Sequence, residues 1–448
     1  MSRIVAIIDG EHYPPVVREA LAELGRSHDV AAAVFAGGTE KVEAGPTDVY
    51  GVPVVRGADV ESALREAVAS YAPEAAIDLS DEPVLSSADR FRLASVALGL
   101  GLSYIGADFQ FDPPLVEAET RTPTLAIVGT GKRVGKTAVS AHVARLLQAR
   151  GLRPVMLAMG RGGPSDPELL RGDEIALTTS DLLAFARQGR HAASDGYEDA
   201  VMARVPTVGC RRCGGGMAGS VFYSNVAEGA ALADSLGLGV IVLEGSGAAV
   251  PPVLADATIL VVGAAQGPRV LTDYFGPLRL ASADAVVIAG ADPALVGGSD
   301  VEALLDLVRA ARPGVPVSAV TFRPRPLEPV VGRRAFLATT APPALLPVLR
   351  EHLEREHGCT VVGASAGLAD RARLRADLEA AAGSYDVLLT ELKAAAIDVV
   401  VETGDAAGIP TVLVDNIPVT VSGDDLGEAA LALASLALGR AAERRGDA

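Results

Sequence analysis

The sequence predicts an α/β protein built mostly from parallel sheets, and two observations support this. Short apolar segments typical of buried strands alternate with longer helical patterns from one end of the chain to the other. Hydrophobic residues make up 49% of the 448 residues and charged residues 21%, so large buried cores can form. A chain of this length is expected to hold about three domains.

Residues 1–118 predict an N-terminal α/β domain. It opens with a strand at Arg3–Ile8, a polar turn, and a helix from about Val16 to Leu24. Several prolines and acids between Asp108 and Pro123 are typical of a linker. The remaining strands of this domain are expected at Asp29–Phe35, Pro53–Val55, Ala75–Leu79 and Leu102–Ile105.

Residues 119–325 predict a second domain. A strand at Thr124–Val128 runs into a glycine-rich loop and a helix at Lys136–Ala149, and a later strand is expected at Val240–Glu244. Residues 160–218 form an insertion that is rich in Arg and Gly and has little clear periodicity. Long irregular segments inside compact α/β domains are usually functional.

Residues 326–448 predict a C-terminal α/β unit. The Pro/Arg-rich stretch Phe322 to Pro329 is expected to be a second linker. Beyond it, strands such as Val387–Leu389 and Thr411–Val414 alternate with helices. This unit is either a separate domain or is fused onto the sheet of the middle region.

The loop between the first strand and helix of the middle region carries a phosphate-binding pattern. It reads Gly129-Thr130-Gly131-Lys132-Arg133-Val134-Gly135-Lys136-Thr137. In such a loop, backbone N–H groups and the helix N-terminus face the phosphates. We expect Lys136 to reach the β- and γ-phosphates of ATP and the Thr137 hydroxyl to bind Mg²⁺. Because Thr130 stands where the first glycine usually falls, a chance glycine-rich turn is the alternative.

This strand, loop and helix together predict a P-loop NTPase core flanked by the N-terminal and C-terminal α/β units. The strand Val240–Glu244 ends in an acid, and a carboxylate at that edge of a P-loop sheet is suited to Mg²⁺. We therefore expect Glu244 to act with Thr137 at the metal, the alternative being an ordinary acid at the end of a strand.

Arginines near this loop are candidate ligands for further phosphates. Arg161 follows an expected strand at Pro154–Met159, and Arg211 and Arg212 are adjacent residues in front of three glycines. A solvated surface arginine is the alternative for Arg161. The flanking cysteines, Cys210 and Cys213, leave a metal site, a redox dithiol and simple packing as open interpretations.

Other candidate substrate contacts follow strands elsewhere in the chain. Asp9, Glu11 and His12 come at the carboxyl end of the first strand, where open α/β sheets hold ligands. Lys393 follows an expected buried strand near the C-terminus and could reach a phosphate. A polar turn and a helix-surface lysine are the respective alternatives. The pair Asp415-Asn416, after a late strand, could recognise a nucleobase.

Composition excludes several classes of partner. The net charge is −17, aromatics are 4% and Trp is absent, which argues against nucleic-acid binding. No segment reads as a signal peptide or as an apolar run of about 20 residues, so a soluble, cytoplasmic protein without a membrane partner is expected. Three cysteines fit a reducing compartment.

Longer motifs add a family resemblance that covers the whole chain. The P-loop together with Glu244-Gly245-Ser246-Gly247 resembles dethiobiotin synthetase. The chain is more similar to the cyclic 2,3-diphosphoglycerate synthetase family. The residues that carry this second resemblance are Ile8-Asp9-Gly10-Glu11-His12-Tyr13, Gly131-Lys132-Arg133 with Gly135-Lys136-Thr137, Met159-Gly160-Arg161-Gly162-Gly163-Pro164 and Cys210-Arg211-Arg212-Cys213-Gly214-Gly215-Gly216.

The resemblance implies a ligase that uses ATP to close a phosphoanhydride within 2,3-diphosphoglycerate, releasing ADP and phosphate. Such a reaction forces two phosphates together, which requires clustered cations. Lys132, Arg133, Arg161, Arg211 and Arg212 are the candidates for that cluster, and the insertion at 160–218 would cover the site like a lid. A homodimer is expected, since P-loop ATPases of this type often pair.

Two other functions stay open at this point. One is another ATP-dependent ligase or kinase acting on a small phosphorylated acid. The other is a P-loop nucleotide-switch protein or metallochaperone, which would show nucleotide-controlled partner binding and slow hydrolysis without a small substrate.

Overall fold

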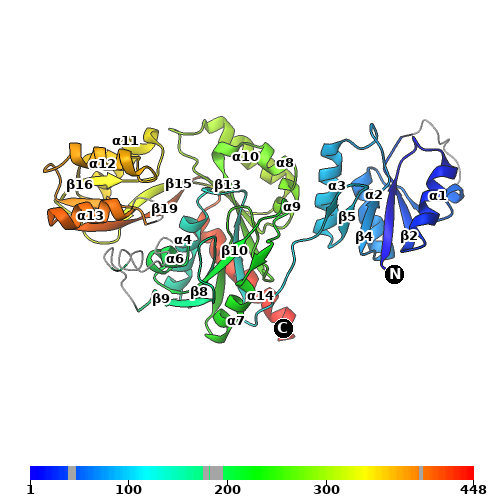
Figure 1. The fold of residues 1–448 in the computed structure, drawn as a ribbon, viewed down its shortest axis with the longest axis horizontal. Helices are drawn as coiled ribbons and strands as arrows, with labels where there is room; N and C mark the ends of the chain where they lie inside the picture. Colours follow the sequence, from blue (N-terminus) through cyan, green and yellow to red (C-terminus); the bar gives the residue numbers. More distant parts are fainter. Residues whose placement is uncertain (39–46, 175–180, 182–194, 393–396, 448) are drawn as a thin grey trace. The chain divides into compact units, whose positions relative to one another are not determined.

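The computed structural model of the chain describes residues 1–38, 47–174, 181, 195–392 and 397–447. These residues form two compact units (Figure 1). The N-terminal unit holds Met1–Leu115 together with Met217–Ser220 and Pro268–Ser282, and the main unit holds the rest. Both are α/β with mostly parallel sheets, so the predicted fold class is confirmed. The expected boundaries near residues 118 and 325 stay predictions.

The N-terminal unit is built on a six-stranded sheet with the order β3-β2-β1-β4-β5-β6. Among the strand pairs that the structure describes in this sheet, only β5–β6 is antiparallel. Alternate residues of β1 enter two different apolar clusters, Val5 and Ile7 in one and Ala6 and Ile8 in the other, so both faces of the sheet are covered. Its elements are β1 (Arg3–Ile8), α1 (Pro14–Leu24), β2 (Asp29–Phe35), β3 (Val54–Val55), α2 (Val60–Tyr71), β4 (Ala75–Asp78), α3 (Ser87–Gly99), β5 (Ser103–Ile105) and β6 (Gln110–Phe111).

The main unit is built on one sheet of 13 strands, whose order is β11-β10-β8-β12-β7-β13-β14-β15-β19-β18-β16-β17, with β9 beside β10. Its first half comprises β7 (Thr124–Gly129), α4 (Lys136–Ala149), β8 (Pro154–Gly160), β9 (Glu168–Arg171), α6 (Asp195–Ala203), β10 (Pro206–Cys213), β11 (Tyr223–Ser224), α7 (Val226–Ser235), β12 (Val240–Glu244), β13 (Ala257–Gly263), β14 (Ala285–Ala289) and α10 (Gly298–Ala311). Between β13 and β14, helices α8 (Arg269–Thr272) and α9 (Gly276–Ala281) belong to the N-terminal unit.

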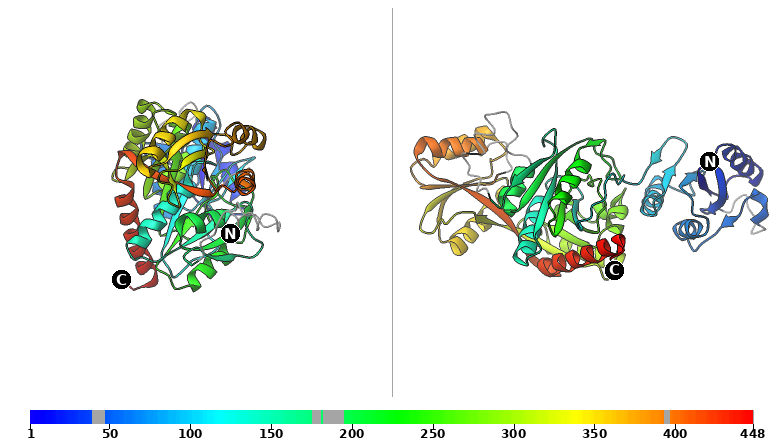
Figure 2. Two further views of the ribbon diagram at one scale, coloured as in Figure 1. Left: turned by 90° about the vertical axis from the view of Figure 1, so that its left-hand side faces the viewer. Right: turned by 90° about the horizontal axis from the view of Figure 1, so that it is seen from below.

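The rest of the main unit contains β15 (Val317–Pro326), β16 (Arg334–Ala338), α11 (Leu346–His357), β17 (Thr360–Ser365), α12 (Arg371–Ala380), β18 (Val387–Thr390), α13 (Ile397–Ala407), β19 (Thr411–Gly423) and α14 (Leu426–Arg445). Helix α14, the last of the chain, lies along the first half of the sheet (Figure 2). Its Ala430, Leu433 and Ala437 share one apolar cluster with Leu125 of β7 and Ile259 of β13. The C-terminal helix therefore completes the core beneath the P-loop strand.

The long strands β15 and β19 join the two halves of this sheet, and β15 shows that one prediction is wrong. The stretch Phe322 to Pro329 was expected to be a linker, but β15 runs through it as far as Pro326. There it pairs antiparallel with β19, placing Phe322 opposite Pro418 and Arg325 opposite Asp415. Strand β15 also pairs with β14 of the first half, and β19 also pairs with β18 of the second half. The C-terminal half is therefore fused onto the P-loop sheet.

The Arg/Gly-rich insertion at 160–218 also differs from its prediction. It was expected to be irregular, but Pro206–Cys213 forms strand β10. This strand pairs parallel with β8 and places Arg211 opposite Gly160. The double-arginine motif therefore lies at the end of a sheet strand. The expected role of the insertion as a lid stays a prediction.

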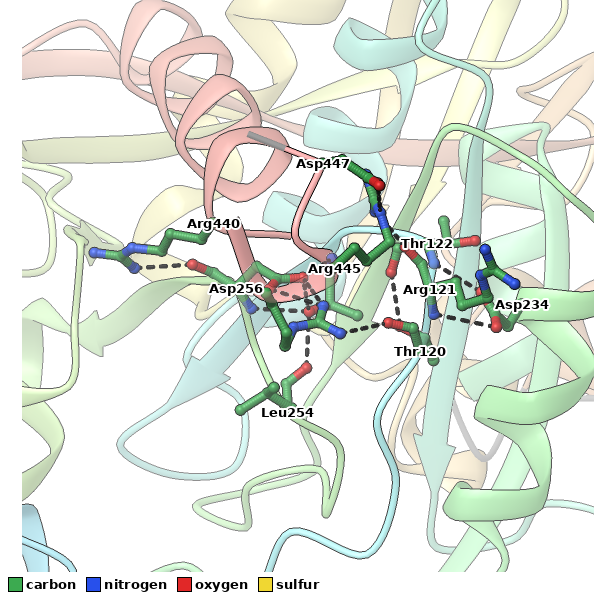
Figure 3. A network of polar contacts seen from close by, with 11 residues as sticks. Thr120, Arg121, Thr122, Asp234, Leu254, Asp256, Arg440, Arg445 and Asp447 are labelled. Atoms are coloured by element: carbon green, nitrogen blue, oxygen red, sulfur yellow. Dashed lines mark hydrogen bonds and ion pairs between the residues drawn. The ribbon is translucent and has the colours of Figure 1, made fainter. Parts of the chain in front are cut away.

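A polar network fixes α14 at the amino ends of the strands (Figure 3). Asp256, just before β13, is buried and accepts hydrogen bonds from the backbone N–H and hydroxyl of Thr124 at 2.8 and 3.0 Å. The same carboxylate pairs with Arg444 of α14 at 3.0 Å, and Arg444 also donates to the carbonyl of Thr120 at 2.7 Å. Asp256 therefore ties the C-terminal helix to the start of the P-loop strand.

We expect Asp256→Ala to lower the free energy of unfolding by about 2–4 kcal/mol, because it leaves the Arg444 guanidinium without its carboxylate. Asp447→Ala is the matched control, since Asp447 pairs with Arg445 on the surface and should contribute less than about 1 kcal/mol. Denaturant unfolding measures both variants, and equal losses would contradict the assignment.

His142, on the P-loop helix α4, gives the main unit a specific pH dependence. Burial, followed by the charges of Arg145 and Arg325, lowers its pKa to about 4, although Asp425 opposes this. In the unfolded chain the pKa of histidine is about 6.5. Between these values the unfolded state binds a proton that the folded state does not, so stability falls as the pH falls.

We expect this effect to remove about 3 kcal/mol of unfolding free energy between pH 7 and pH 4. Chemical unfolding of the wild type and of His142→Gln at both pH values isolates the contribution, since every other group titrates in both proteins. The variant should lose less stability on acidification. The same loss in both proteins would show that His142 is not the group responsible.

Candidate active site

Four neighbouring strands of the main-unit sheet end beside one another and carry the predicted site. Strands β10, β8, β12 and β7 are adjacent and parallel. Their carboxyl ends deliver the double arginine, Arg161, Glu244 and the P-loop to a single edge. This is the edge at which open α/β sheets bind ligands.

The P-loop surrounds the side chain of Lys136. This lysine is buried, and its Nζ donates to the carbonyl of Gly131 at 2.8 Å. A Cβ on Gly129 would lie 2.8 Å from Cδ of Lys136, so a glycine is required there. Gly135 precedes α4 with a φ of 90°, and the ring of Phe322 would clash with any Cβ at that position. The loop is therefore shaped for its backbone to approach a phosphate.

Thr137 and Glu244 are in direct contact, as the sequence predicts for a shared metal. The Thr137 hydroxyl donates to Oε1 of Glu244 at 2.6 Å. Glu244 is 3% exposed, and among the described residues its Oε2 accepts no hydrogen bond. A buried carboxylate oxygen without a donor, beside a P-loop threonine, fits a hard cation such as Mg²⁺.

Arg161 and Arg212 form a pair of like charges at the same edge of the sheet. Gly247 lies just beyond β12, and a Cβ there would be 2.6 Å from Nη2 of Arg161 and 3.3 Å from Nη2 of Arg212. Arg212 is half-buried and donates to the carbonyl of Ser246 at 2.7 Å. Burial, then the charge of Arg161, lowers its pKa, while Asp195 opposes the shift.

Within the part of the chain that the structure describes, Arg161 is exposed and forms no hydrogen bond or ion pair. Two guanidiniums over the same glycine, one of them uncompensated, are suited to an anion with several negative oxygens. We call Arg161 and Arg212 the arginine pair. Lys132 and Arg133 are exposed within the P-loop.

Arg211 faces away from the arginine pair, because successive residues of a strand point to opposite faces of a sheet. Its Nε donates to the carbonyls of Gly163 and Pro164 at 3.1 and 2.6 Å. The same alternation separates the two cysteines. Cys210 is buried, which raises its pKa to about 12, and Cys213 is exposed. The geometry thus favours packing over a dithiol or a two-cysteine metal site.

The predicted substrate residues Asp9, Glu11 and His12 lie in the N-terminal unit. Burial opposes the charge of Asp9, but hydrogen bonds from the backbone N–H of Asp81 and from His12 and Glu11 outweigh it and lower its pKa. His12 also contacts Asp81, with Nε2 3.3 Å from Oδ2. Asp9 therefore organises the turn after β1. Lys393 lies outside the described residues.

Sequence reasoning missed two polar side chains that support this edge. Gln266 accepts from the Thr130 hydroxyl at 2.6 Å and from the backbone N–H of Gly263 at 2.9 Å, fixing the start of the P-loop. Asn225 accepts a hydrogen bond from the backbone N–H of Arg211, on the strand that carries both arginines. Neither belongs to a motif, although Asn225 directly precedes α7, a position that indicates a helix cap.

The predicted nucleobase pair has other partners in the structure. Asp415 is buried and pairs with Arg145 at 2.9 Å and Arg325 at 3.1 Å. Asn416 donates to Glu391 at 3.1 Å.

None of the helices in the described residues has the length and apolar character needed to span a membrane.

Comparison with known families shows which family the chain belongs to. Three family models match the chain: the N-terminal domain of cyclic 2,3-diphosphoglycerate synthetase over residues 3–112, its P-loop domain over 124–321 and its C-terminal domain over 326–417. The chain belongs to the cyclic 2,3-diphosphoglycerate synthetase family.

Individual relatives align over almost the full length of the chain. A cyclic 2,3-diphosphoglycerate synthetase from Rubrobacter xylanophilus is 46% identical and covers 99% of both chains. The one from Thermococcus kodakarensis is 46% identical over 98% of this chain and 100% of its own, and the one from Methanothermobacter thermautotrophicus is 42% identical over 97% and 96%. Among solved structures, LpxK from Aquifex aeolicus matches 73% of this chain and 90% of its own at 14% identity, with a TM-score of 0.40.

In this synthetase-family chain, we expect Lys136→Ala to weaken ATP binding roughly 10- to 100-fold, because it removes the charged donor to the phosphates. Titration calorimetry with ATP measures the loss. Arg150→Ala, at the far end of the same helix, is the control and should bind ATP like the wild type. Unchanged binding in Lys136→Ala would refute the P-loop assignment.

Proposed function

We propose that this chain catalyses the ATP-dependent closure of a phosphoanhydride within 2,3-diphosphoglycerate, giving cyclic 2,3-diphosphoglycerate, ADP and phosphate. The observation that carries the proposal is the arginine pair at the same edge of the sheet as the P-loop and Glu244, in a chain of this family. ATP phosphates and the substrate's phosphates can then be held at one edge of the sheet.

The reaction proceeds in two displacements. An oxygen of one substrate phosphate attacks the γ-phosphorus of ATP, and the bond to the β-phosphate oxygen breaks to release ADP. An oxygen of the second substrate phosphate then attacks the phosphorus of the activated one. Ring closure expels inorganic phosphate, which carries the γ-phosphorus that came from ATP.

The P-loop binds and orients the ATP phosphates in the first displacement. The backbone N–H groups of the loop and the start of α4 face the phosphates, and Lys136 supplies a point charge close to them. Thr137 and Glu244 would hold Mg²⁺, which neutralises phosphate charge when bound. Lys132 and Arg133, at the mouth of the loop, are proposed to contact the same phosphates.

The arginine pair is proposed to hold the substrate. 2,3-Diphosphoglycerate is a small polyanion whose two phosphates repel each other. Arg161 and Arg212 offset that repulsion and bring the two groups within bonding distance, which is the main barrier to ring closure. Asp9, Glu11, His12 and Lys393 stay predictions of the sequence as further substrate contacts.

The finer points of the function rest on the same reasoning. We propose a cytoplasmic enzyme that acts as a homodimer. We also propose that it has no nucleic-acid or membrane partner, because its acidic surface repels phosphate groups. Another ligase or kinase on a small phosphorylated acid would use the same arginine pair. A nucleotide switch would leave the pair without a role, and this disfavours it.

The test is phosphorus NMR of the products formed from ATP, Mg²⁺ and 2,3-diphosphoglycerate. We expect ADP and phosphate in equal amounts with a new anhydride signal, and Arg212→Ala should slow turnover by about 10²-fold while ATP affinity stays within about twofold. Substrate-dependent turnover without an anhydride would favour another ligase or kinase. Slow hydrolysis that ignores the substrate would favour the switch.

A further inference from the structure

The side chain of Asn225 is used in a way that its position in the sequence does not suggest. It occupies the N-cap of α7, where an asparagine usually bonds the first turn of its own helix, but it makes no such bond. Its Oδ1 instead accepts from the backbone N–H of Arg211 at 2.7 Å. Its Nδ2 donates to the carbonyls of Pro164 and Ser165 at 3.2 and 3.0 Å. Asn225 thus joins strand β10 to the loop after β8.

Arg211 strengthens the same junction. Its Nε donates to the carbonyls of Gly163 and Pro164, in the loop that Asn225 holds. The loop lies directly on the strand, because a Cβ on Gly163 would be only 2.0 Å from the carbonyl oxygen of Cys210. Asn225 is 5% exposed, and both its polar atoms are engaged. It is therefore buried too deeply to act as a substrate ligand.

The loop held in this way carries Arg161, and the strand carries Arg212. These two guanidiniums repel each other before any anion is bound, so the loop needs other bonds to stay in place. A site whose cations are already in place does not have to be reorganised when the polyanion binds.

We propose that Asn225 and Arg211 are positioning residues, which hold the loop of Arg161 against the strand of Arg212 so that the arginine pair is assembled before the substrate arrives. This inference rests on the proposed function for the identity of the substrate. It assigns no contact with 2,3-diphosphoglycerate to either residue. It gives Arg211 a role different from the catalytic one that the sequence predicts.

The decisive experiment is a double-mutant cycle with Asn225→Ala and Arg161→Ala, read out by calorimetric binding of 2,3-diphosphoglycerate and, separately, of ADP. We expect Asn225→Ala to weaken binding of 2,3-diphosphoglycerate by about tenfold and binding of ADP by less than about twofold. In the Arg161→Ala background the same change should cost less than about twofold, since its effect passes through Arg161. A general loss of folding would lower both affinities.

A second readout does not depend on the substrate. Hydrogen exchange of the backbone amides at residues 161–163, 165 and 166 should become faster in Asn225→Ala and in Arg211→Ala, and stay unchanged in Arg355→Ala, a surface arginine control. Asn225→Asp is nearly isosteric and keeps the acceptor for Arg211, but it turns an oxygen toward the two carbonyls. It should match Asn225→Ala, and it decides the question if the alanine variant does not fold.

Independent losses from Asn225→Ala and Arg161→Ala, or unchanged exchange in that loop, would overturn the positioning role while leaving the proposed function intact. If the wild type fails to bind 2,3-diphosphoglycerate, the proposed function itself is wrong, and with it the identity of the ligand for the arginine pair.

Discussion

Repulsion between like charges is the constraint on which the site depends. Phosphates must gather on a chain whose net charge is −17, and the cations that attract them also repel one another. The fold meets both demands at the carboxyl ends of β10, β8, β12 and β7. There a buried lysine, backbone N–H groups and two guanidiniums converge from different strands, and the sheet holds them in place. Lys136 and Arg212 are fixed by bonds to backbone carbonyls, whereas the Arg161 side chain is exposed and is placed by the loop that carries it.

The parts of this arrangement that the sequence predicted are local. The P-loop is one continuous stretch in which strand, glycines, Lys136 and helix follow one another, so its pattern survives without knowledge of the fold. Glu244 could be placed because an acid ends an apolar strand. Arg161 and Arg212 were selected by composition and by family resemblance. Their meeting over Gly247 depends on the order of three strands, which no local pattern specifies.

The predictions that failed have physical reasons. Strand β10 reads Pro-Thr-Val-Gly-Cys-Arg-Arg-Cys, in which glycine and two arginines interrupt the apolar pattern, although its central residues Thr207 to Cys210 are buried. Strand β15 contains Pro324 and Pro326, which suggested a linker. Beyond Val320 no strand among the described residues pairs with it on the side of β14, so the missing N–H groups cost little there. Asn225 and Gln266 act over distances in sequence that a motif search does not cover.

The long β15–β19 pair also limits how such a chain can be rearranged. The matched P-loop domain ends at residue 321 and the C-terminal domain begins at 326, both within β15. A fragment cut there would expose the edge of β14 or a shortened β15, and it would lack α14, which covers the P-loop strand from the far end of the sequence. The P-loop and C-terminal domains follow one another along the sequence, but in the folded protein they share one sheet. The two halves must therefore be inherited, and exchanged between genes, as a single piece.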